Sequence, residues 1–325
     1  MKLKNKFPLL LIFVFLFNSN LFSQNSSKEF NWNISLNFGC LFGQTNELLN
    51  YMNEDVRLSQ LDWNVEIPVF NLEGNLNYKN FILGFSGETS LPVKSGVMKD
   101  YDWLNWDYYK THELSYFSCH DNYLDYYYKL GADFGYNFII NNLFIIKPYI
   151  NLKTEGIKFT AKDGYTQYAP FDDDGKRIWT ESLPKKNVYG SIITYLQTIN
   201  SGGIGINTVF SPQKAIILEL NPSFNIINYV SYDFHCTRYQ VFADEILIGI
   251  SYDLTAKSKF FLNDYSSLNI IYKFQFIPEQ IGSSYNQECS QWNTWENGKW
   301  FLQTDSQGGI KRLFSTFTLG YELYF

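Results

Sequence analysis

The strongest constraint on the fold is an alternation of apolar and polar residues that recurs along the chain. From Leu313 to Phe325 most odd positions are apolar, while even positions mix Thr, Gly and Glu. Successive side chains of a β-strand point to opposite faces, so such a segment has one apolar and one polar face. The same pattern runs from Trp32 to Glu47, from Tyr123 to Phe138 and from Ile216 to Phe234. The alternation predicts an all-β protein.

The aromatic content narrows the choice of β-protein. Aromatic residues make up 19% of the chain, and no segment after the N-terminal one is an uninterrupted apolar stretch of spanning length. The remaining candidates are a large secreted β-protein and a membrane β-barrel. The alternating segments recur at about the ten-residue length of a spanning strand, and their polar faces carry charge, as a barrel lumen can. This favours a transmembrane antiparallel β-barrel.

The N-terminal segment indicates export. Lys2, Lys4 and Lys6 precede an apolar run from Leu9 to Phe17, and small or polar residues follow through Gln24. This order is typical of a secretory signal peptide, and the run is shorter than the roughly 20 residues of a transmembrane helix. We therefore expect a signal peptide at residues 1–24 and a single outer-membrane barrel domain at 25–325.

Turn residues divide the chain into about ten strands, an even number that suits a closed barrel with both ends on the periplasmic side. The expected strands lie near 31–43, 60–78, 80–93, 123–140, 143–162, 187–210, 214–233, 239–254, 260–278 and 312–325. Short connections at 78–80, 141–142, 211–214 and 255–259 are predicted periplasmic turns, and the long connections 94–122, 163–186 and 279–311 are predicted extracellular loops.

Two pairs of ionisable residues fall on positions that this alternation turns inward. Between residues 81 and 93 the polar residues take even positions, so a continued register points Asp100 and Asp102 into the lumen. In the strand at 214–233 the polar set is odd, so Asp233 and His235 also face the lumen. The first of these strands runs from a short turn toward a long loop, and the strand at 214–233 runs in the same direction. The two pairs are therefore expected at the extracellular mouth.

An Asp-x-Asp pair and an Asp-x-His pair at the mouth of a ten-stranded barrel resemble the omptin family of outer-membrane aspartyl-type proteases. The resemblance covers nearly the whole mature chain. "ISLNFGCLFGQTNE" at 34–47 looks like the first strand of the family, "SQLDW" at 59–63 like the start of the second, and "MKDYDW" at 98–103 like the Asp-Asp motif. "KFTAKDG" at 158–164 is similar to a segment after the fifth strand. The terminal Phe325 resembles the signature through which the barrel assembly machinery recognises its substrates.

The resemblance implies an endopeptidase that activates a water molecule between the two pairs. His235 would be the general base, since it can take a proton near neutral pH, and Asp233 would orient it and stabilise its imidazolium form. Asp100 and Asp102 would bind and polarise the same water, and two adjacent carboxylates should raise the pKa of one of them. No acyl-enzyme is expected, because no Ser or Cys is paired with a base in the sequence.

Simpler interpretations stay open for each residue. Each aspartate could be a solvated loop charge, and His235 could lie on the surface like His112 and His120, which fall in a predicted loop. The four residues could also bind a divalent metal ion, since carboxylates and imidazole are suitable ligands, although our prediction is a site without metal.

A non-enzymatic barrel of the same fold, an adhesin or ligand-binding protein, is the competing function. The charged residues expected in a narrow lumen, Glu66 and Lys129 among them, disfavour a porin.

The resemblance also points to a substrate pocket and a lipid contact, and the chain departs from the family at both. Glu47 matches one acidic member of the pocket that prefers basic residues, but the second member would fall at Ser231, which is neutral. A broader preference at the residue before the scissile bond is expected. Family members depend on lipopolysaccharide held by basic residues, and Gly156 stands where an arginine would be expected. Lipopolysaccharide or a similar outer-membrane lipid is the only bound cofactor that the resemblance suggests.

The charge balance agrees with extracellular peptide or protein substrates. The formal net charge is −6, and without the three lysines of the signal segment 23 basic residues stand against 32 acidic ones, a net of −9. A basic peptide would be steered toward such a surface. No basic patch is present in the sequence, so nucleic acid is not an expected partner.

Overall fold

The structure, a computed structural model, describes residues 30–52, 56–105, 112–288 and 299–325. The predicted signal peptide lies outside the described residues. Every regular element of this part of the chain is a β-strand. No helix in it is long and apolar enough to cross a membrane.

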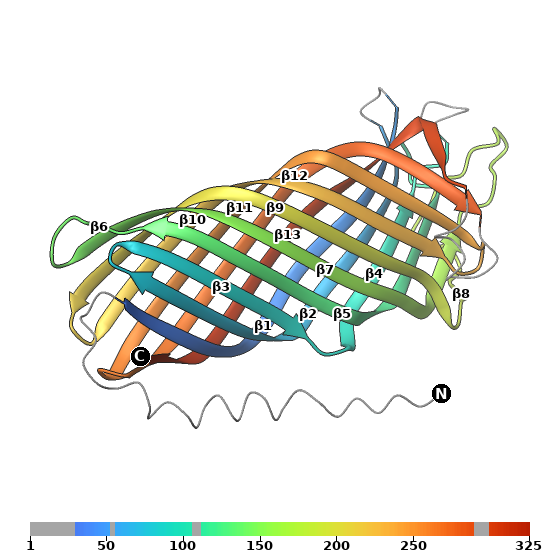
Figure 1. Ribbon diagram of the computed structural model, residues 1–325. Coiled ribbons are helices and arrows are strands. Elements are labelled where there is room, and N and C mark those ends of the chain that lie inside the picture. Colours follow the sequence, from blue (N-terminus) through green and yellow to red (C-terminus); the bar gives the residue numbers. More distant parts are fainter. Residues whose placement is uncertain (1–29, 53–55, 106–111, 289–298) are drawn as a thin grey trace, which may run out of the picture.

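Thirteen strands form one antiparallel sheet that closes on itself (Figure 1). They are β1 (Phe30–Tyr51), β2 (Arg57–Tyr78), β3 (Phe81–Ser90), β4 (Val93–Asp102), β5 (Tyr116–Tyr136), β6 (Phe138–Ile139), β7 (Phe144–Tyr168), β8 (Lys186–Asn187), β9 (Ser191–Gln213), β10 (Ile216–His235), β11 (Gln240–Asn263), β12 (Ser266–Glu288) and β13 (Phe301–Tyr324). The strands β3 and β4 follow one another between β2 and β5, and the short β6 and β8 only pair with β7. The ring therefore has ten strand positions, as predicted.

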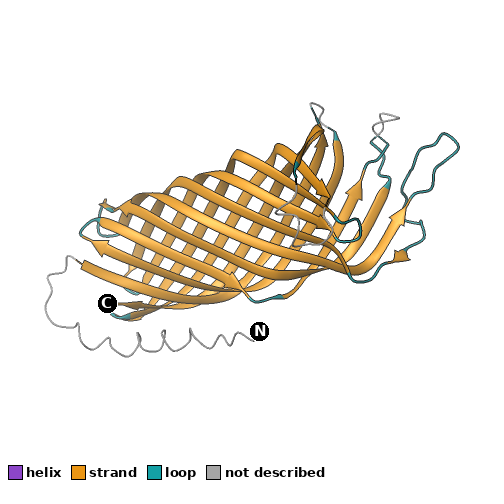
Figure 2. Cartoon of the chain, turned by 45° about the vertical axis from the view of Figure 1, so that its right-hand side comes forward, coloured by secondary structure: helices purple, strands orange, loops and turns teal. Residues whose placement is uncertain are grey.

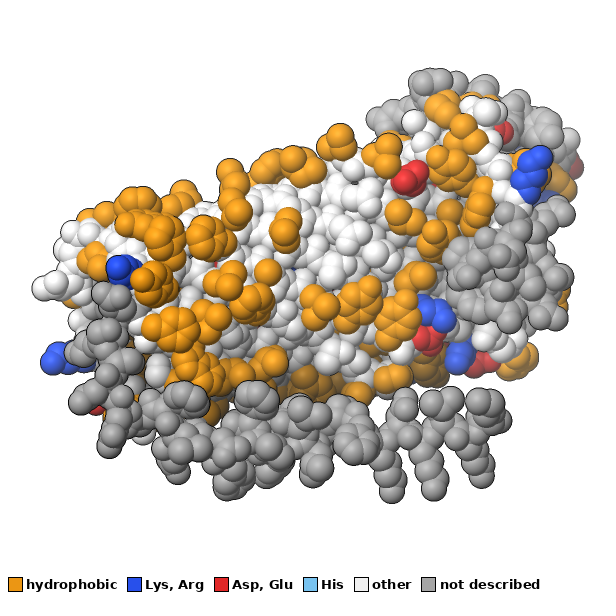
Figure 3. Space-filling model, viewed as in Figure 1, with side chains coloured by type: hydrophobic (Ala, Val, Ile, Leu, Met, Phe, Trp, Pro, Cys, Tyr) orange, Lys and Arg blue, Asp and Glu red, His pale blue; other side chains and the backbone are white. Residues whose placement is uncertain are grey.

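An apolar band covers the outside of the barrel, because alternate side chains of each strand point outward. On β1, Leu36, Phe38 and Phe42 are exposed, whereas Ser35 and Asn37 between them are buried in the lumen. On the face in Figure 3, hydrophobic side chains cover the barrel wall, and most charged ones lie toward its two ends. The alternation read from the sequence is confirmed on this strand.

The longer loops lie at one end of the barrel (Figure 2), and the strands there continue beyond the apolar band. The outward apolar residues stop at Phe42 on β1, at Ile226 on β10 and at Leu247 on β11, while β1 and β10 run on to Tyr51 and His235. The predicted loops 94–122, 163–186 and 279–311 are therefore wrong in part, since β4, β5, β7, β12 and β13 extend into them. Above the band the outward face is no longer consistently apolar, so the alternation that marks a strand is weaker there.

One predicted turn is also wrong. Residues 255–259 lie inside β11, and the chain turns at residues 264–265 before β12 begins. Lys257 and Lys259 point into the lumen and form ion pairs there. The polar run was read as a turn because lumen-facing lysines alternate with the small Ala256 and Ser258.

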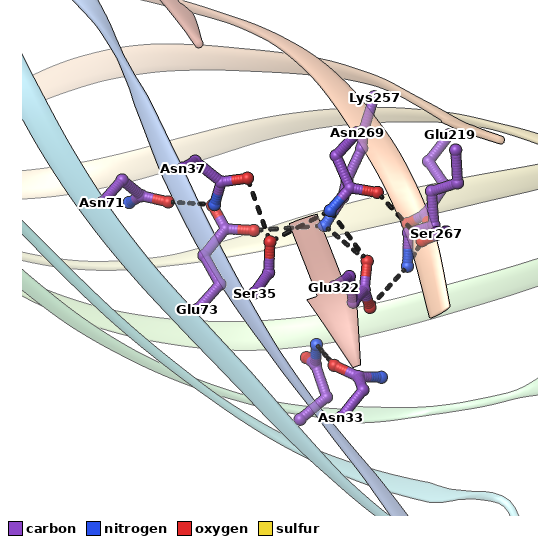
Figure 4. A network of polar contacts seen from close by, with 12 residues as sticks. Asn33, Ser35, Asn37, Asn71, Glu73, Glu219, Lys257, Ser267, Asn269 and Glu322 are labelled. Atoms are coloured by element: carbon purple, nitrogen blue, oxygen red, sulfur yellow. Dashed lines mark hydrogen bonds and ion pairs between the residues drawn. The ribbon is translucent and has the colours of Figure 1, made fainter. Parts of the chain in front are cut away.

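Charged and polar side chains that form ion pairs and hydrogen bonds between different strands line a cavity of about 330 Å³ in the lower lumen. Glu322 on β13 is fully buried and pairs with Lys257 at 3.4 Å (Figure 4). It also pairs with Lys259 at 3.2 Å. Lys273 on β12 reaches Glu73 on β2 at 3.0 Å. Carboxylates and ammonium groups are therefore matched inside this part of the barrel. Glu66 was predicted to belong to this set, but it lies on the outward face of β2 and is exposed.

Apolar side chains fill the upper lumen. Trp63 is fully buried, with its ring 5.1 Å from that of Tyr195 and 5.7 Å from that of Phe159. A second cluster beside it consists of Ile199, Ile227, Tyr229, Ile246, Ile277 and Ile310. The two clusters separate the charged lower lumen from the mouth. Ionisable groups above them therefore lie on an apolar floor.

The closed ring with its apolar band predicts the behaviour of an outer-membrane protein. After cell fractionation the chain should be found with outer membranes, and unboiled protein should migrate faster in SDS gels than boiled protein. A closed barrel resists SDS until it is heated, because all its strands are paired. Recovery in the soluble periplasmic fraction would contradict the barrel.

Candidate active site

Asp233 and His235 lie at the end of β10 and form a direct contact. Odd positions face the lumen along β10, so the sequence placed both residues correctly. Asp233 Oδ2 is 2.7 Å from His235 Nε2, and the Asp233 side chain is almost completely buried. The Phe242 ring on β11 meets the imidazole edge-on at 5.3 Å. The histidine is thus fixed by a carboxylate and by an aromatic ring.

Asp100 and Asp102 lie at the end of β4, and Asp100 is buried as predicted. The reason is different from the one inferred from the sequence. The predicted register puts Lys94 inside, but Lys94 is exposed and pairs with Asp121 at 2.8 Å on the outer wall. Ser95, at an odd position, is buried instead.

Two irregularities account for this. The chain breaks between β3 and β4 at Leu91 and Pro92, which shifts the inward set from even to odd positions. A bulge between Lys94 and Val97, where Gly96 has a φ of 79°, shifts it back. Glycine adopts this left-handed conformation without strain. The two shifts cancel, so Asp100 faces the lumen.

The two pairs act on each other electrostatically. Burial raises the pKa of Asp100 well above its usual value, and the negative charges of Asp102 and then Asp233 raise it further. Burial also raises the pKa of Asp102, while a hydrogen bond from Ser59 and the charges of Arg238 and His235 oppose the change. The strands β4 and β10 are separated by β5, β7 and β9 on one side and by five strands on the other. The two pairs therefore face one another across the mouth.

Glu47 and Ser231 lie in the same mouth, as predicted. Both are buried and face the lumen, Glu47 on β1 and Ser231 on β10. Burial raises the pKa of Glu47 well above its usual value, followed by the charges of Asp233, Asp244 and Asp100. Glu47 therefore belongs to the same group of carboxylates as the two pairs.

Asp244 also belongs to this group, and the sequence analysis missed it. It lies on β11 directly opposite Ser231, and it is buried. Burial raises its pKa to about 7, a hydrogen bond from Ser284 opposes the change, and the charge of Asp233 adds to it. A bulge opposite Ile227 and Tyr229 moves the inward set of β11 from odd to even positions. The three consecutive apolar residues at 246–248 were the signal that could have revealed it.

Arg238 and Ser59 were also missed. Arg238 is exposed in the turn after β10, and its positive charge lowers the pKa of both Asp100 and Asp102. Ser59 pairs with Asp102 in the register of β2 and β4. An arginine or a serine near a loop is common in any sequence and does not indicate a site. Only the strand arrangement of the barrel shows that these two residues lie near the carboxylates.

The other two histidines are not part of the mouth group. His112 is exposed, as predicted, but His120 was wrongly expected on a loop surface. It is buried on β5, and its ring nitrogens lie 2.5 Å from the Asp163 carbonyl oxygen and 2.8 Å from the Ser118 hydroxyl. Burial lowers its pKa. Its role is to connect β5 to β7.

Two features bear on the groups that the chain could bind. Within the described ranges, no group of three or more His, Cys, Asp and Glu side chains is arranged so that it could hold a metal ion. On the outer wall, a side chain at Gly156 would meet the Tyr128 ring at 2.4 Å. An arginine could not enter this position unless the tyrosine moved, so the lipid contact of the resemblance is altered here.

Comparisons with known proteins agree with this architecture. A sequence model described as the Omptin family matches residues 27–325. The plasminogen activator of Yersinia pestis is 36% identical over 75 residues, which is 22% of this chain and 24% of that protein. The crystal structure of the outer membrane protease OmpT from Escherichia coli has a TM-score of 0.79 at 17% identity, covering 93% of this chain and 99% of that one.

The buried carboxyl group of Asp244 predicts how stability depends on pH. Because the folded pKa is raised to about 7 from an ordinary 3.8, the folded state holds the proton more tightly. The contribution of Asp244 to the free energy of unfolding is fully present below about pH 4. It is lost as the pH rises toward 7, and this loss lowers the free energy of unfolding by up to about 4 kcal/mol. We expect Asp244→Asn to unfold at a higher temperature than the wild type at pH 8, but not at pH 4, in thermal melts in detergent.

Glu245→Gln is the matched control, because it removes one carboxylate from the next residue on the other strand face. It should not change the melting temperature in this pH-dependent way. Equal melting temperatures for Asp244→Asn and the wild type at pH 8 would contradict the raised pKa.

Proposed function

The chain belongs to the omptin family, and we propose from this premise that it is an outer-membrane endopeptidase that hydrolyses extracellular proteins or peptides. The match to the family over residues 27–325 and the shared barrel support this proposal. The main observation in its support is that the Asp233–His235 pair and the Asp100–Asp102 pair both lie in the mouth of the barrel and influence each other electrostatically. The site faces the extracellular side, since it lies at the end with the longer loops.

His235 acts as the general base. Its Nε2 contacts Asp233 Oδ2, so Nε2 carries the proton in the neutral ring, and Nδ1 accepts the proton of the water. Asp233 stabilises the imidazolium ion that forms, because it is a buried carboxylate next to the new positive charge. The second carboxylate oxygen, Asp233 Oδ1, is buried without a hydrogen-bond partner in the described residues. It is therefore available to a group that enters the mouth.

Asp100 and Asp102 hold the water from the facing wall. Burial and the charges of Asp102 and Asp233 raise the pKa of Asp100, which favours the sharing of one proton between Asp100 and Asp102. With that proton the pair presents both a donor and an acceptor. A donor and an acceptor together fix the orientation of a water molecule. Arg238 limits the repulsion between the two carboxyl groups, because its charge lowers the pKa of both.

The reaction proceeds by direct attack of this water. The water oxygen bonds to the carbonyl carbon of the peptide while one of its protons passes to His235 Nδ1. Collapse of the tetrahedral intermediate breaks the carbon–nitrogen bond, and His235 returns the proton to the departing amine. The products are a new carboxyl end and a new amino end, and no covalent enzyme intermediate forms.

We expect single substitutions of the four residues to abolish most of the turnover. His235→Ala, Asp233→Asn, Asp100→Ala and Asp102→Ala should each reduce kcat by a factor on the order of 10² to 10⁴, with smaller changes in KM. Purified barrel would be incubated with a peptide library, and the products would be read by mass spectrometry.

Two controls make this test specific. All four variants should keep heat-modifiable migration, because the strand pairing and the apolar band are unchanged. The double variant His235→Ala with Asp100→Ala should lose much less than the product of the single losses, since both residues serve one water. Peptide cleavage that survives all four substitutions would exclude this site. A folded wild-type barrel that binds peptides without cutting them would favour the adhesin or ligand-binding alternative.

Chelation separates the proposed mechanism from a metal site. Activity should be unchanged by EDTA, because in the proposed mechanism the water is activated by side chains alone. Dialysis against EDTA, followed by assays with and without an added divalent ion, measures this. Loss of cleavage on chelation and its return with the ion would replace the proposed mechanism by a metal-dependent one.

A further inference from the structure

A chain of hydrogen bonds crosses the lumen directly below the mouth. Gln197 on β9 and Arg312 on β13 are at its centre, and their side chains are 0% and 1% exposed. Arg312 Nη2 donates to Gln197 Oε1, and Arg312 Nη1 forms an ion pair with Glu155 on β7. Three strands separate β9 from β13 on the shorter way round the ring. These contacts therefore join distant walls of the barrel through its interior.

The amide of Gln197 connects two further strands to this chain. Gln197 Nε2 donates to the Tyr195 hydroxyl at 2.6 Å and to Thr45 Oγ1 at 2.9 Å. The Tyr195 hydroxyl lies 2.9 Å from that of Tyr229 on β10. Thr45 on β1 is the direct cross-strand partner of Arg312. An amide can do this because it supplies donors and an acceptor at the same time.

Tyr195 connects the chain to both pairs of the proposed site. It is the direct partner of Asp233 in the register of β9 and β10, and its ring stacks on Trp63 at 5.1 Å. Trp63 is in turn the direct partner of Met98 on β4, which lies two residues before Asp100. Directly opposed side chains on one face of a sheet are in contact distance. The Trp63–Tyr195 stack therefore extends from the wall of Asp100 to the wall of Asp233.

We propose that Gln197 and Arg312 are positioning residues, which hold the Trp63–Tyr195 stack in place and so set the separation between the two pairs. Both lie below the mouth and act through the stack. One water can be held by both walls only at a suitable separation, and a misplacement of about 1 Å can lower a rate about 10²-fold. This inference rests on the proposed endopeptidase function, because it concerns the geometry of that site.

The chemistry of the buried arginine favours a positioning role. Apolar side chains of similar volume often stabilise a protein as well as a buried ion pair does, so stability alone is a weak reason for burying a guanidinium group. Its planar fork fixes the directions of several acceptors at once. Here these acceptors are Glu155 Oε1, Gln197 Oε1 and, at 3.3 Å, Gln275 Oε1. They come from three different strands, whose relative positions are thereby fixed.

Isosteric substitutions test the role of the chain. Gln197→Met and Arg312→Met keep the volume and remove the hydrogen bonds. Each should lower kcat by roughly tenfold to a hundredfold with little change in KM, because the peptide still binds while the two pairs are misplaced. Steady-state cleavage of one peptide measures both constants. An unchanged kcat in Gln197→Met would overturn the inference.

Lys273→Met is the matched control, because it removes a buried ion pair of the lower lumen, 3.0 Å from Glu73, that does not contact this chain. It should lower the melting temperature but leave kcat unchanged. If it lowers kcat as much as Arg312→Met does, any loss of a buried ion pair has this effect, and the inference fails.

Conservative variants distinguish positioning from a purely structural role. Thr45→Ser keeps the hydroxyl group and should keep kcat, whereas Thr45→Val keeps the shape without the hydroxyl and should lower kcat. Tyr195→Phe retains the stack on Trp63 but loses the bond to Gln197, so it should lower kcat too. Equal kcat values for Thr45→Ser and Thr45→Val would contradict the role of the hydrogen bond.

The double variant Gln197→Met with Arg312→Met separates stability from geometry. It replaces both buried polar partners by apolar side chains, and Glu155 keeps Lys129 at 3.3 Å. The melting temperature should therefore return toward that of the wild type, while kcat stays low. Recovery of kcat together with the melting temperature would show a structural role only.

Distances between spin labels separate this inference from the proposed function. Lys99→Cys on β4 and Thr198→Cys on β9 place labels on partly exposed positions beside Asp100 and Gln197, in a chain whose four native cysteines are replaced by serine. Pulsed EPR of the folded barrel should give a narrow distance distribution. Gln197→Met or Arg312→Met should broaden it, and Lys273→Met should not.

The two readouts have distinct outcomes. If the distribution broadens as expected but the wild type cleaves no peptide, the chain does fix the two walls and the protease function fails. If the wild type cleaves peptides but Gln197→Met leaves the distribution unchanged, the positioning role is wrong and the protease function stands.

Discussion

The rest of the structure depends on one constraint, the pairing of every strand in a closed ring. In lipid an unpaired backbone N–H or C=O group costs several kcal/mol, so strands can cross a membrane only when the sheet has no edge. The β1–β13 pair closes this ring, with Phe325 stacked on Trp32 at 3.9 Å. Once the ring is closed, alternate residues of a strand face outward or into the lumen, so two neighbouring lumen-facing side chains of one strand are two residues apart. This is why the proposed site is built from Asp-x-Asp and Asp-x-His.

The lumen is divided into layers that give the mouth its character. In the lower lumen, lysines and carboxylates neutralise one another. Arg312 forms an ion pair with Glu155 and donates a hydrogen bond to Gln197. In the middle, Trp63 and the isoleucine cluster pack beside the hydrogen-bonded Tyr195 and Tyr229. At the top, carboxylates remain on an apolar floor without enough positive charge around them. Their raised pKa values follow from this arrangement, and so does the affinity that we propose for a water molecule.

The sequence predicted the barrel, the ten strand positions and the inward face of β10, because those features follow from uninterrupted alternation. Asp233 and His235 were placed correctly for this reason. Asp100 was placed correctly only because the break at Leu91–Pro92 and the bulge at Gly96 cancel, and Lys94 between them was placed on the wrong face. Asp244 was missed because a bulge shifts the inward set of β11. A bulge is one extra residue in one strand, and it is recognised only when the partner strand and its register are known.

The central claim is that water held in the mouth attacks the peptide bond directly. Mass spectrometry of the purified, folded barrel during cleavage of a lysine-containing peptide in ¹⁸O-labelled water tests this claim most directly. The account predicts that the new carboxyl end carries the label from the first turnover and that the intact barrel never gains the mass of a peptide fragment. A barrel that carries a covalent acyl fragment, or one that leaves the peptide intact, would contradict the account.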